Sequence, residues 1–210
     1  MANKFWEKMF TKSVRRAQEH YGTRKNYTRI ETSSKPADFE GLGDLEKDFI
    51  ESRDGFYMAT VNDEGQPYIQ FRGGPAGFLN VLDDMTLGYA DFRGNLQYIS
   101  VGNLAANDRA ALFLMDYAHQ KRLKIIARVE VKDEAEAPEL IETLRMPDYK
   151  AKIERAMTLH VEAFEWNCPQ YITQRFTINE IKQSMQPIYD RIEKLEAENI
   201  RLKALVRIQR

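Results

Sequence analysis

Short β-type segments and turn signals alternate over much of the chain between residues 56 and 166. FYMATV at 56–61 and QPYIQF at 66–71 flank the turn sequence NDEG, so together they predict a β-hairpin. Further strands are predicted at 78–82, 86–90, 109–117, 122–131 and 157–166. Antiparallel strands that follow one another this closely form a sandwich or a barrel, not a parallel sheet of βαβ units. The sequence therefore predicts a mainly β, α+β fold.

Residues 1–54 predict a helical extension ahead of these strands. The apolar positions of its first part recur at helical spacing, at Phe10, Val14 and Ala17. A later short helix is predicted to begin at Asp44, whose carboxylate suits a helix cap. Leu45 and Phe49 would share its buried face, and Gly55 would end it.

Two helices are predicted between the strands and one after them. SVGNLAAND predicts a short helix that starts at Ser100 or Gly102. Pro138–Met146 predicts another, with its proline in the first turn and an apolar face made of Leu140, Ile141 and Leu144. Thr177 and Glu180 have the spacing of a capping box, which predicts the start of the final helix.

From residue 185 onward the apolar positions follow the heptad repeat of a coiled coil. Its a and d positions are Met185, Ile188, Ile192, Leu195, Asn199, Leu202 and Val206. Asn199 at an a position favours a parallel two-stranded pair, because a buried amide is best satisfied by its own copy. Pro187 is expected to break the helix before the coil.

Residues 181–210 are therefore expected to form a separate coiled-coil segment. Residues 188–206 would join two copies of the chain, as a homodimer or as a link between dimers in a tetramer. The alternative is an amphipathic helix that lies on its own domain. A DNA-binding zipper does not fit, because the preceding INEIKQSMQPIYD is not a basic recognition helix.

Composition narrows the class of protein further. Lys+Arg 31 and Asp+Glu 32 nearly balance, so no general attraction to nucleic acid or to an anionic membrane is expected. Cys168 is the sole cysteine, and no apolar run has the length of a bilayer span or a secretory leader, which favours a cytoplasmic protein. The three histidines are scattered, so no metal site is expected.

Three segments combine glycine, arginine and amide side chains in a way that suits an anion. Gln70–Pro75 offers a strand end, a cation and two glycines; Tyr89–Asn95 offers a second arginine at a turn. Ser100–Asn103 supplies a helix N-terminus, which attracts negative charge. Each segment also has an ordinary interpretation as a turn, a surface charge or a helix cap. Composition and spacing alone leave both interpretations open.

The order YMATVNDEGQPYIQFRGGP, GYADFRGN, SVGNLAANDRAALFLMDY and RLKIIARVEV resembles the split-barrel flavoproteins related to pyridoxamine 5′-phosphate oxidase. Asn107–Arg109 nearly matches the Asn-Pro-Arg of that family, and residues 167–176 resemble a subgroup whose substrates are uncharacterised. The resemblance covers roughly residues 8 to 180. It implies a six-stranded antiparallel split β-barrel over residues 55–180 that binds FMN.

Carried over by position, Gln70–Gly73 match the strand that contacts the flavin, and Tyr89–Asp91 match the strand beside the ribityl chain and phosphate. Ser100 stands where many relatives have a phosphate-binding lysine, so Arg93 or Lys124 would have to supply that charge. The residues expected to hold the cofactor are Gln70, Phe71, Arg72, Gly73, Tyr89, Ala90, Asp91, Arg93, Asn95, Gln97, Ser100, Asn103 and Lys124, and, in the segment that closes over the flavin in the family, Gln170 and Arg175.

The resemblance implies an FMN-dependent oxidoreductase that exchanges a hydride with a small molecule at flavin N5. One alternative is a flavin- or ligand-binding dimer without turnover that uses its coiled coil for assembly. Another is a split barrel that has lost FMN, which the serine at position 100 keeps open. The substrate, the electron donor and the choice between FMN, FAD and a deazaflavin stay open at this stage.

Overall fold

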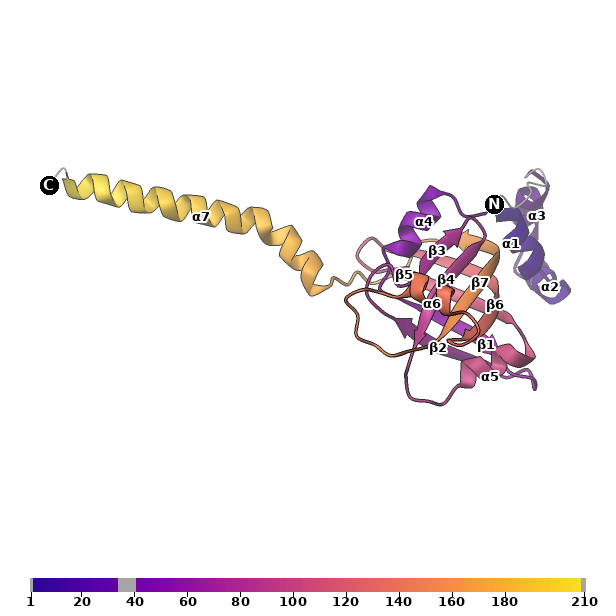
Figure 1. Cartoon of the computed structure of the whole chain (residues 1–210). Coiled ribbons are helices and arrows are strands. Elements are labelled where there is room, and N and C mark those ends of the chain that lie inside the picture. Colours follow the sequence, from indigo (N-terminus) through magenta and orange to yellow (C-terminus); the bar gives the residue numbers. More distant parts are fainter. Residues whose placement is uncertain (1, 34–40, 209–210) are drawn as a thin grey trace. The chain divides into compact units, whose positions relative to one another are not determined.

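The protein, described by a computed structural model over residues 2–33 and 41–208, is built on one antiparallel sheet (Figure 1). Within these residues the strand order is β2-β1-β5-β6-β7-β4-β3. The strands are β1 Gly55–Val61, β2 Pro67–Gly73, β3 Asn80–Asp83, β4 Thr86–Phe92, β5 Arg109–Asp116, β6 Lys121–Asp133 and β7 Ile153–Trp166. The predicted mainly β fold with flanking helices is confirmed. The barrel that the resemblance implies has six strands, whereas the sheet has seven, because the short β3 pairs with β4 at one edge.

The β1–β2 hairpin forms where the sequence predicts it. Asn62 Oδ1 accepts the backbone N–H groups of Glu64 at 3.1 Å and Gln66 at 2.7 Å. Gly65 adopts a φ of 84°, a left-handed conformation that costs glycine little because it has no Cβ. The polar turn sequence is therefore sufficient to reverse the chain here.

The sheet curls until strands that are distant in its order face each other. The Phe56 ring on β1 stacks on Phe78 at 5.8 Å and meets Tyr89 of β4 edge-on at 5.5 Å. Arg72 on β2 donates to Asp91 on β4, although four strands separate β2 from β4 in the sheet. These contacts close the sheet into a split barrel. Its core includes the fully buried Leu79, Leu87, Leu114, Leu123, Ile125 and Leu159.

Seven helices accompany the strands in the described residues. They are α1 Ala2–Met9, α2 Lys12–His20, α3 Arg24–Ser33, α4 Asp44–Glu51, α5 Ile99–Ala106, α6 Pro138–Leu144 and α7 Ile178–Ile208. The predicted N-terminal apolar stripe is only partly correct, since Phe10 is buried whereas Val14 is 37% exposed. Phe10 packs against Trp6 of α1, with 4.8 Å between ring centroids.

Helix α4 departs from its prediction at both ends. Its N-cap is Gly43, not Asp44, and the Glu46 carboxylate accepts the Gly43 N–H at 3.2 Å. Leu45 is 62% exposed, so it does not share the buried face of Phe49. The helix ends at Glu51, before the predicted Gly55, which instead begins β1.

The helices between the strands lie close to their predicted positions. Helix α5 begins at Ile99, one residue before the first predicted start, after Tyr98 in a left-handed conformation with a φ of 51°. Pro138 occupies the first turn of α6, as predicted, and Ile141 and Leu144 are buried there. Strand β7 begins at Ile153, earlier than the predicted residue 157.

The chain divides into two compact units. The first comprises residues up to Asp116 and Gln120–Gln170, and contains the sheet; the second comprises Tyr117–His119 and Tyr171–Arg210, and contains α7. The domain limits at residues 54 and 180 stay predictions. No helix among the described residues combines the length and the apolar character needed to cross a membrane.

Helix α7 starts with the predicted capping box. Glu180 Oε2 accepts the Thr177 N–H at 2.6 Å, and Thr177 Oγ1 accepts the Glu180 N–H at 3.2 Å. The predicted break at Pro187 is wrong, because the helix runs through this residue without interruption. Proline removes one backbone donor and crowds the preceding turn, which bends a long helix. Figure 1 shows such a bend in the orange N-terminal part of α7.

Candidate functional site

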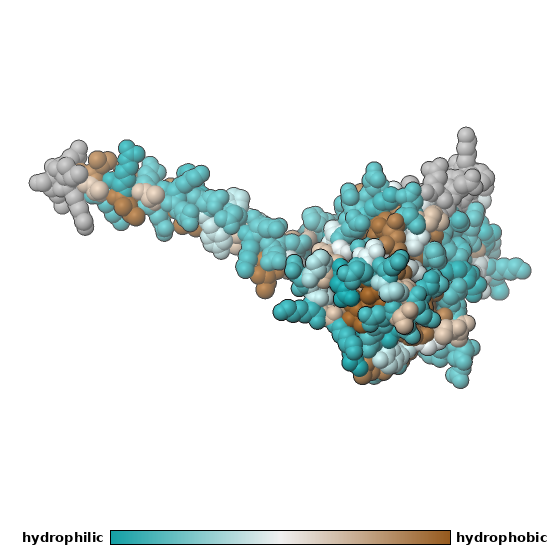
Figure 2. Space-filling model, viewed as in Figure 1, coloured by the Kyte–Doolittle hydropathy of each residue, from teal (hydrophilic) through white to brown (hydrophobic). Residues whose placement is uncertain are grey.

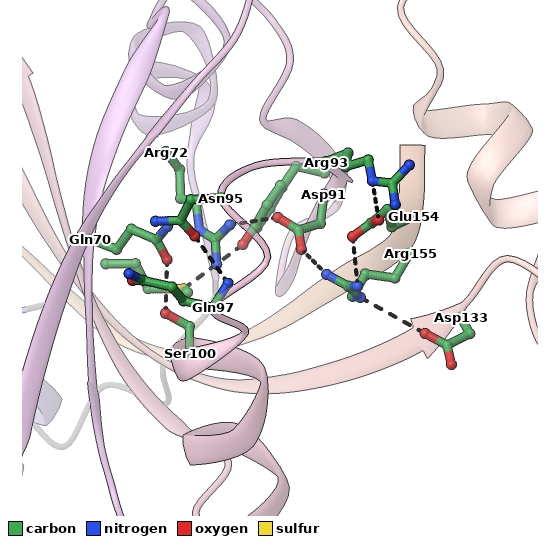
Figure 3. Close-up of polar contacts among 12 residues, drawn as sticks. Gln70, Arg72, Asp91, Arg93, Asn95, Gln97, Ser100, Asp133, Glu154 and Arg155 are labelled. Atoms are coloured by element: carbon green, nitrogen blue, oxygen red, sulfur yellow. Dashed lines mark hydrogen bonds and ion pairs between the residues drawn. The ribbon is translucent and has the colours of Figure 1, made fainter. Parts of the chain in front are cut away.

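A charged cluster joins β2, β4 and the start of β7 (Figure 3). Asp91 on β4 is 3% exposed and accepts hydrogen bonds from two guanidinium groups. Arg72 Nη1 lies 2.6 Å from Asp91 Oδ1, and Arg155 Nη1 lies 2.7 Å from Asp91 Oδ2. One buried carboxylate thus fixes two cations in place.

Glu154 extends this cluster toward the surface. It accepts from Arg155 at 3.0 Å and pairs with the half-exposed Arg93 at 3.2 Å. Burial alone would lower the pKa of Arg155, but its hydrogen bonds to Asp91 and Glu154 outweigh this and raise the pKa above its ordinary value. Three guanidinium groups are paired here with three carboxylates, those of Asp91, Glu154 and the more exposed Asp133, so the cluster as a whole is formally neutral.

Two hollows meet at this cluster and share Gln70, Arg72, Asp91, Phe92 and Gly94. The smaller, of about 40 Å³, is otherwise lined by Tyr68, Asn95, Leu96, Gln97, Tyr98, Ile99, Ser100, Val101, Glu154 and Arg155. The larger, of about 250 Å³, is otherwise lined by Phe71, Gly73, Phe78, Tyr89, Ala90, Arg93, Tyr149 and Ala151. One hollow is therefore rich in polar donors and the other in aromatic surface.

The smaller hollow carries the donors that a phosphate requires. The Arg72 Nε is buried and has no hydrogen-bond partner within the described protein. The first turn of α5 borders the same hollow, and the N–H groups of a helix start attract anions. Ser100 Oγ donates to Gln70 Oε1 at 3.1 Å, which fixes that amide with its NH₂ group still available. These groups fit a phosphorylated ligand.

The comparisons with known proteins agree with this geometry. The family model described as pyridoxamine 5′-phosphate oxidase matches residues 42–200. The chain belongs to this family. The match begins and ends later than the resemblance in the sequence suggested, so α1–α3 lie outside it whereas much of α7 lies inside. Membership of the pyridoxamine 5′-phosphate oxidase family supports a flavin as the cofactor.

Solved structures with a similar fold share few residues with this chain. HupZ of Group A Streptococcus is 18% identical, with a TM-score of 0.48, over 64% of this chain and 99% of that protein. A pyridoxamine 5′-phosphate oxidase, described as putative, from Lactobacillus delbrueckii is 17% identical, with a TM-score of 0.47, over 60% and 93%. An FMN-binding protein from Syntrophomonas wolfei is 13% identical, with a TM-score of 0.42, over 71% and 97%. A search of the curated proteins found no match.

Most residues expected to hold the family cofactor line the two hollows. They are Gln70, Phe71, Arg72, Gly73, Tyr89, Ala90, Asp91, Arg93, Asn95, Gln97 and Ser100. The side chains of Tyr89 and Ala90 are buried in the core, where the Tyr89 hydroxyl lies 4.0 Å from Met58 Sδ. Burial raises the pKa of Tyr89, so this phenol stays neutral.

The remaining expected residues lie elsewhere. Asn103 is buried and donates to Thr60 Oγ1 at 3.0 Å, which ties α5 to β1. Lys124 pairs with Glu165 at 3.2 Å and lines a separate apolar hollow beside α1. Gln170 is exposed at the end of the first unit. In the second unit, the Arg175 guanidinium lies 5.1 Å from the centroid of the Tyr117 ring.

The glycines at the end of β2 have a packing role that the sequence did not reveal. A Cβ at Gly74 would lie 2.7 Å from Phe78 Cγ, and one at Gly73 would lie 2.8 Å from Phe71 Cε1. The space beside these two glycines is therefore filled by the chain's own aromatic rings. Gly94 differs, because a Cβ there would meet nothing within 4 Å.

Sequence reasoning missed Arg155, Glu154 and Tyr98. Arg155 lies opposite Asp91 in the β4–β7 register, and its guanidinium lies 5.0 Å from the centroid of the Tyr98 ring. Arg155 could have been found from the pairing of β4 with β7, because that pairing brings the buried Asp91 carboxylate opposite an arginine. The predicted strand began at residue 157 and so excluded both Glu154 and Arg155.

Proposed function

We propose that the chain binds FMN, with its phosphate in the smaller hollow and its ring system against the larger one. The observation that carries this proposal is the pair of arginines, Arg72 and Arg155, fixed by Asp91 beside the first turn of α5. Family membership supports a flavin, and the donors of the smaller hollow favour one that ends in a single phosphate.

The arginines take the place of the lysine that many relatives have at position 100. Ser100 is 2% exposed and its hydroxyl is donated to Gln70, so it contributes no charge. The arginines offer N–H donors to a phosphate, and the buried Nε of Arg72 is one that has no partner within the described protein. Arg155 therefore joins Arg93 as a cationic group beside the two hollows.

The activity that this arrangement supports best is an FMN-dependent oxidoreductase acting on a small molecule. Bound FMN supplies reversible hydride transfer at its N5 atom. The residues of the chain would hold and orient the ring: Phe71 and Tyr149 provide aromatic walls, and Tyr149 is fixed by Phe92 at 5.0 Å between ring centroids. No acid or base is required from the chain for a hydride transfer of this kind.

The binding proposal is tested by comparing FMN with riboflavin, which lacks the phosphate. In the unmodified chain FMN should bind more tightly than riboflavin. Arg72→Gln should weaken FMN binding by about tenfold or more, the equivalent of about 1.5–3 kcal/mol for a charged hydrogen bond, and leave riboflavin binding nearly unchanged. Gln97→Ala, at an exposed position, repeats the comparison without disturbing a buried pair.

Arg145→Gln serves as the matched control, because Arg145 forms an exposed ion pair with Glu142 on α6, away from both hollows. Circular dichroism of each variant establishes that it is folded. Equal affinity for FMN and riboflavin in the unmodified chain would contradict the phosphate site.

Activity is tested by anaerobic reduction of the FMN-loaded chain with NADPH or NADH, followed by reoxidation with candidate acceptors. Reduction within seconds would support the oxidoreductase. A flavin that binds and is not reduced would favour the binding protein without turnover. A chain that takes up no FMN would favour a scaffold, the alternative that the serine at position 100 suggests.

A further inference from the structure

Helix α7 presents an apolar stripe to solvent along most of its length. Ile188 is 53% exposed, Ile192 45%, Leu195 46% and Leu202 53%. Successive members of this stripe are three, four or seven residues apart, so they lie on one side of the helix. Figure 2 shows brown apolar side chains recurring along α7 between teal hydrophilic ones. A stripe of this form, flanked by charge, is typical of a coiled-coil seam.

A groove of about 450 Å³ follows the same stripe. Ile192 and Leu195 form one part of it, Asn199 lies beside them, and the groove is bordered by Glu196, Lys203 and Ile200. In heptad terms these are a, d and e positions of successive turns, except for Ile200, which is at b. The groove therefore has the composition of the holes that receive side chains from a second helix. The side chain of Val206, the last predicted a position, is outside the described residues.

The charges beside the stripe match those of a second copy of α7 in parallel orientation. Arg191 at g would meet Glu196 at e of the second copy. Glu198 at the next g would meet Lys203 at e. Both pairs have opposite sign in the same register, and the register also places Asn199 against its own copy, where the two amides can bond each other.

An antiparallel pair cannot satisfy these groups together. There g faces g and e faces e, so Arg191 against Glu198 needs one register and Glu196 against Lys203 needs another. In the first register Asn199 faces Ile188, and in the second it faces Leu202. Either arrangement buries an amide against an apolar side chain, which costs free energy.

We propose that two copies of the chain associate through residues 188–206 of α7 as a parallel, two-stranded coiled coil with Asn199 paired to its own copy. The seam lies within a helix that the capping box starts and that Pro187 bends without ending. In the heptad, Pro187 is at a c position, away from the seam, so its missing donor does not interrupt the contact.

The test is disulfide trapping in the full chain. Cys168 is exposed and is first replaced by serine, so that it cannot cross-link. Asn199→Cys is then compared with Ala197→Cys, a control at an f position on the outer side of the same turn. With oxidised glutathione as the electron acceptor, the Asn199→Cys chain should form mostly covalent dimers on a non-reducing gel, and the Ala197→Cys chain few.

Ile192→Cys repeats the measurement at the preceding a position, so the test does not depend on one substitution. Association of the barrels alone would raise cross-linking at positions 197 and 199 equally. Equal cross-linking at these positions, or none at 192 and 199 in chains whose circular dichroism is unchanged, would overturn the parallel coiled coil. Strong preference for 192 and 199 establishes both its orientation and its register.

Discussion

Arg72 Nη1 and Asp91 Oδ1 lie 2.6 Å apart, although their strands β2 and β4 are separated by four others in the sheet. Because Asp91 also accepts from Arg155 on β7, one buried carboxylate links the two sides of the split barrel. Its removal would leave two guanidinium groups facing each other in a poorly hydrated place. The stability of the barrel and the shape of the candidate flavin site thus depend on the same residue.

We expect Asp91→Asn to lower the free energy of unfolding by about 3–5 kcal/mol, the usual cost of removing one partner from a buried ion pair. Urea unfolding followed by circular dichroism, without added flavin, measures this. Glu142→Gln removes one partner of the exposed pair with Arg145 and should change the midpoint little. A midpoint for Asp91→Asn equal to that of the control would contradict the structural role of this carboxylate.

Gly74 and Gly94 differ in the space that an added Cβ would meet. Gly74→Ala should cost about 1–3 kcal/mol, because the added Cβ overlaps the Phe78 ring and overpacking has that effect. Gly94→Ala should be nearly neutral, since its Cβ enters open space. Thermal or urea unfolding of the pair is the measurement. A reversed order would show that Gly74 has no packing role.

These glycines also show which features of the fold can be predicted from the sequence alone. The strands were predictable because alternation and turn residues are local signals, as the β1–β2 hairpin and its Asn62 turn show. The role of Gly74 was not, because a glycine before proline in a turn looks the same whether a ligand or Phe78 fills the space beside it. Only the packed structure distinguishes the two.

The candidate site was predictable only in part, because only some of its residues are marked by local sequence signals. Arg72 and Asp91 are 19 positions apart and were both expected from the resemblance, whereas Arg155 is 64 positions from Asp91 and was missed. Its contribution depends on the register of β4 with β7, which no local pattern reveals. At Pro187 a local rule was misleading, because the helix on both sides is long enough to tolerate one lost hydrogen bond.

Acid should loosen the attachment of α1 to the sheet. Burial would raise the pKa of Glu162 on β7, but hydrogen bonds from Lys8 of α1 and Arg128 of β6, with their charges, lower it below its ordinary value. A carboxyl whose folded pKa is depressed contributes stability above the unfolded value of 4.5, and this contribution is lost as pH falls through the folded pKa.

Glu162→Gln should therefore be less stable than the unmodified chain near pH 7, and the difference should disappear as the pH falls below 4.5 and through the lowered pKa of Glu162, where this carboxyl becomes uncharged. Unfolding midpoints measured across this range test the expectation. Glu64→Gln, in the exposed β1–β2 turn, controls for the loss of a carboxylate as such. A stability difference for Glu162→Gln that stays constant as the pH falls would show that its ion pairs contribute nothing.

The amide of Asn199 should lower the stability of the coiled coil while it selects two strands in one register. Asn199→Ile places an apolar side chain at the centre of the seam, so the helical circular-dichroism signal of α7 should persist to higher temperature. The same change removes the bond that selects two strands in one register, so assemblies heavier than those of the unmodified chain should appear by light scattering. Ala197→Ile adds the same side chain on the outer side of the helix and should do neither. If the two variants behave alike, the stripe is an ordinary exposed helix face and not a pairing seam.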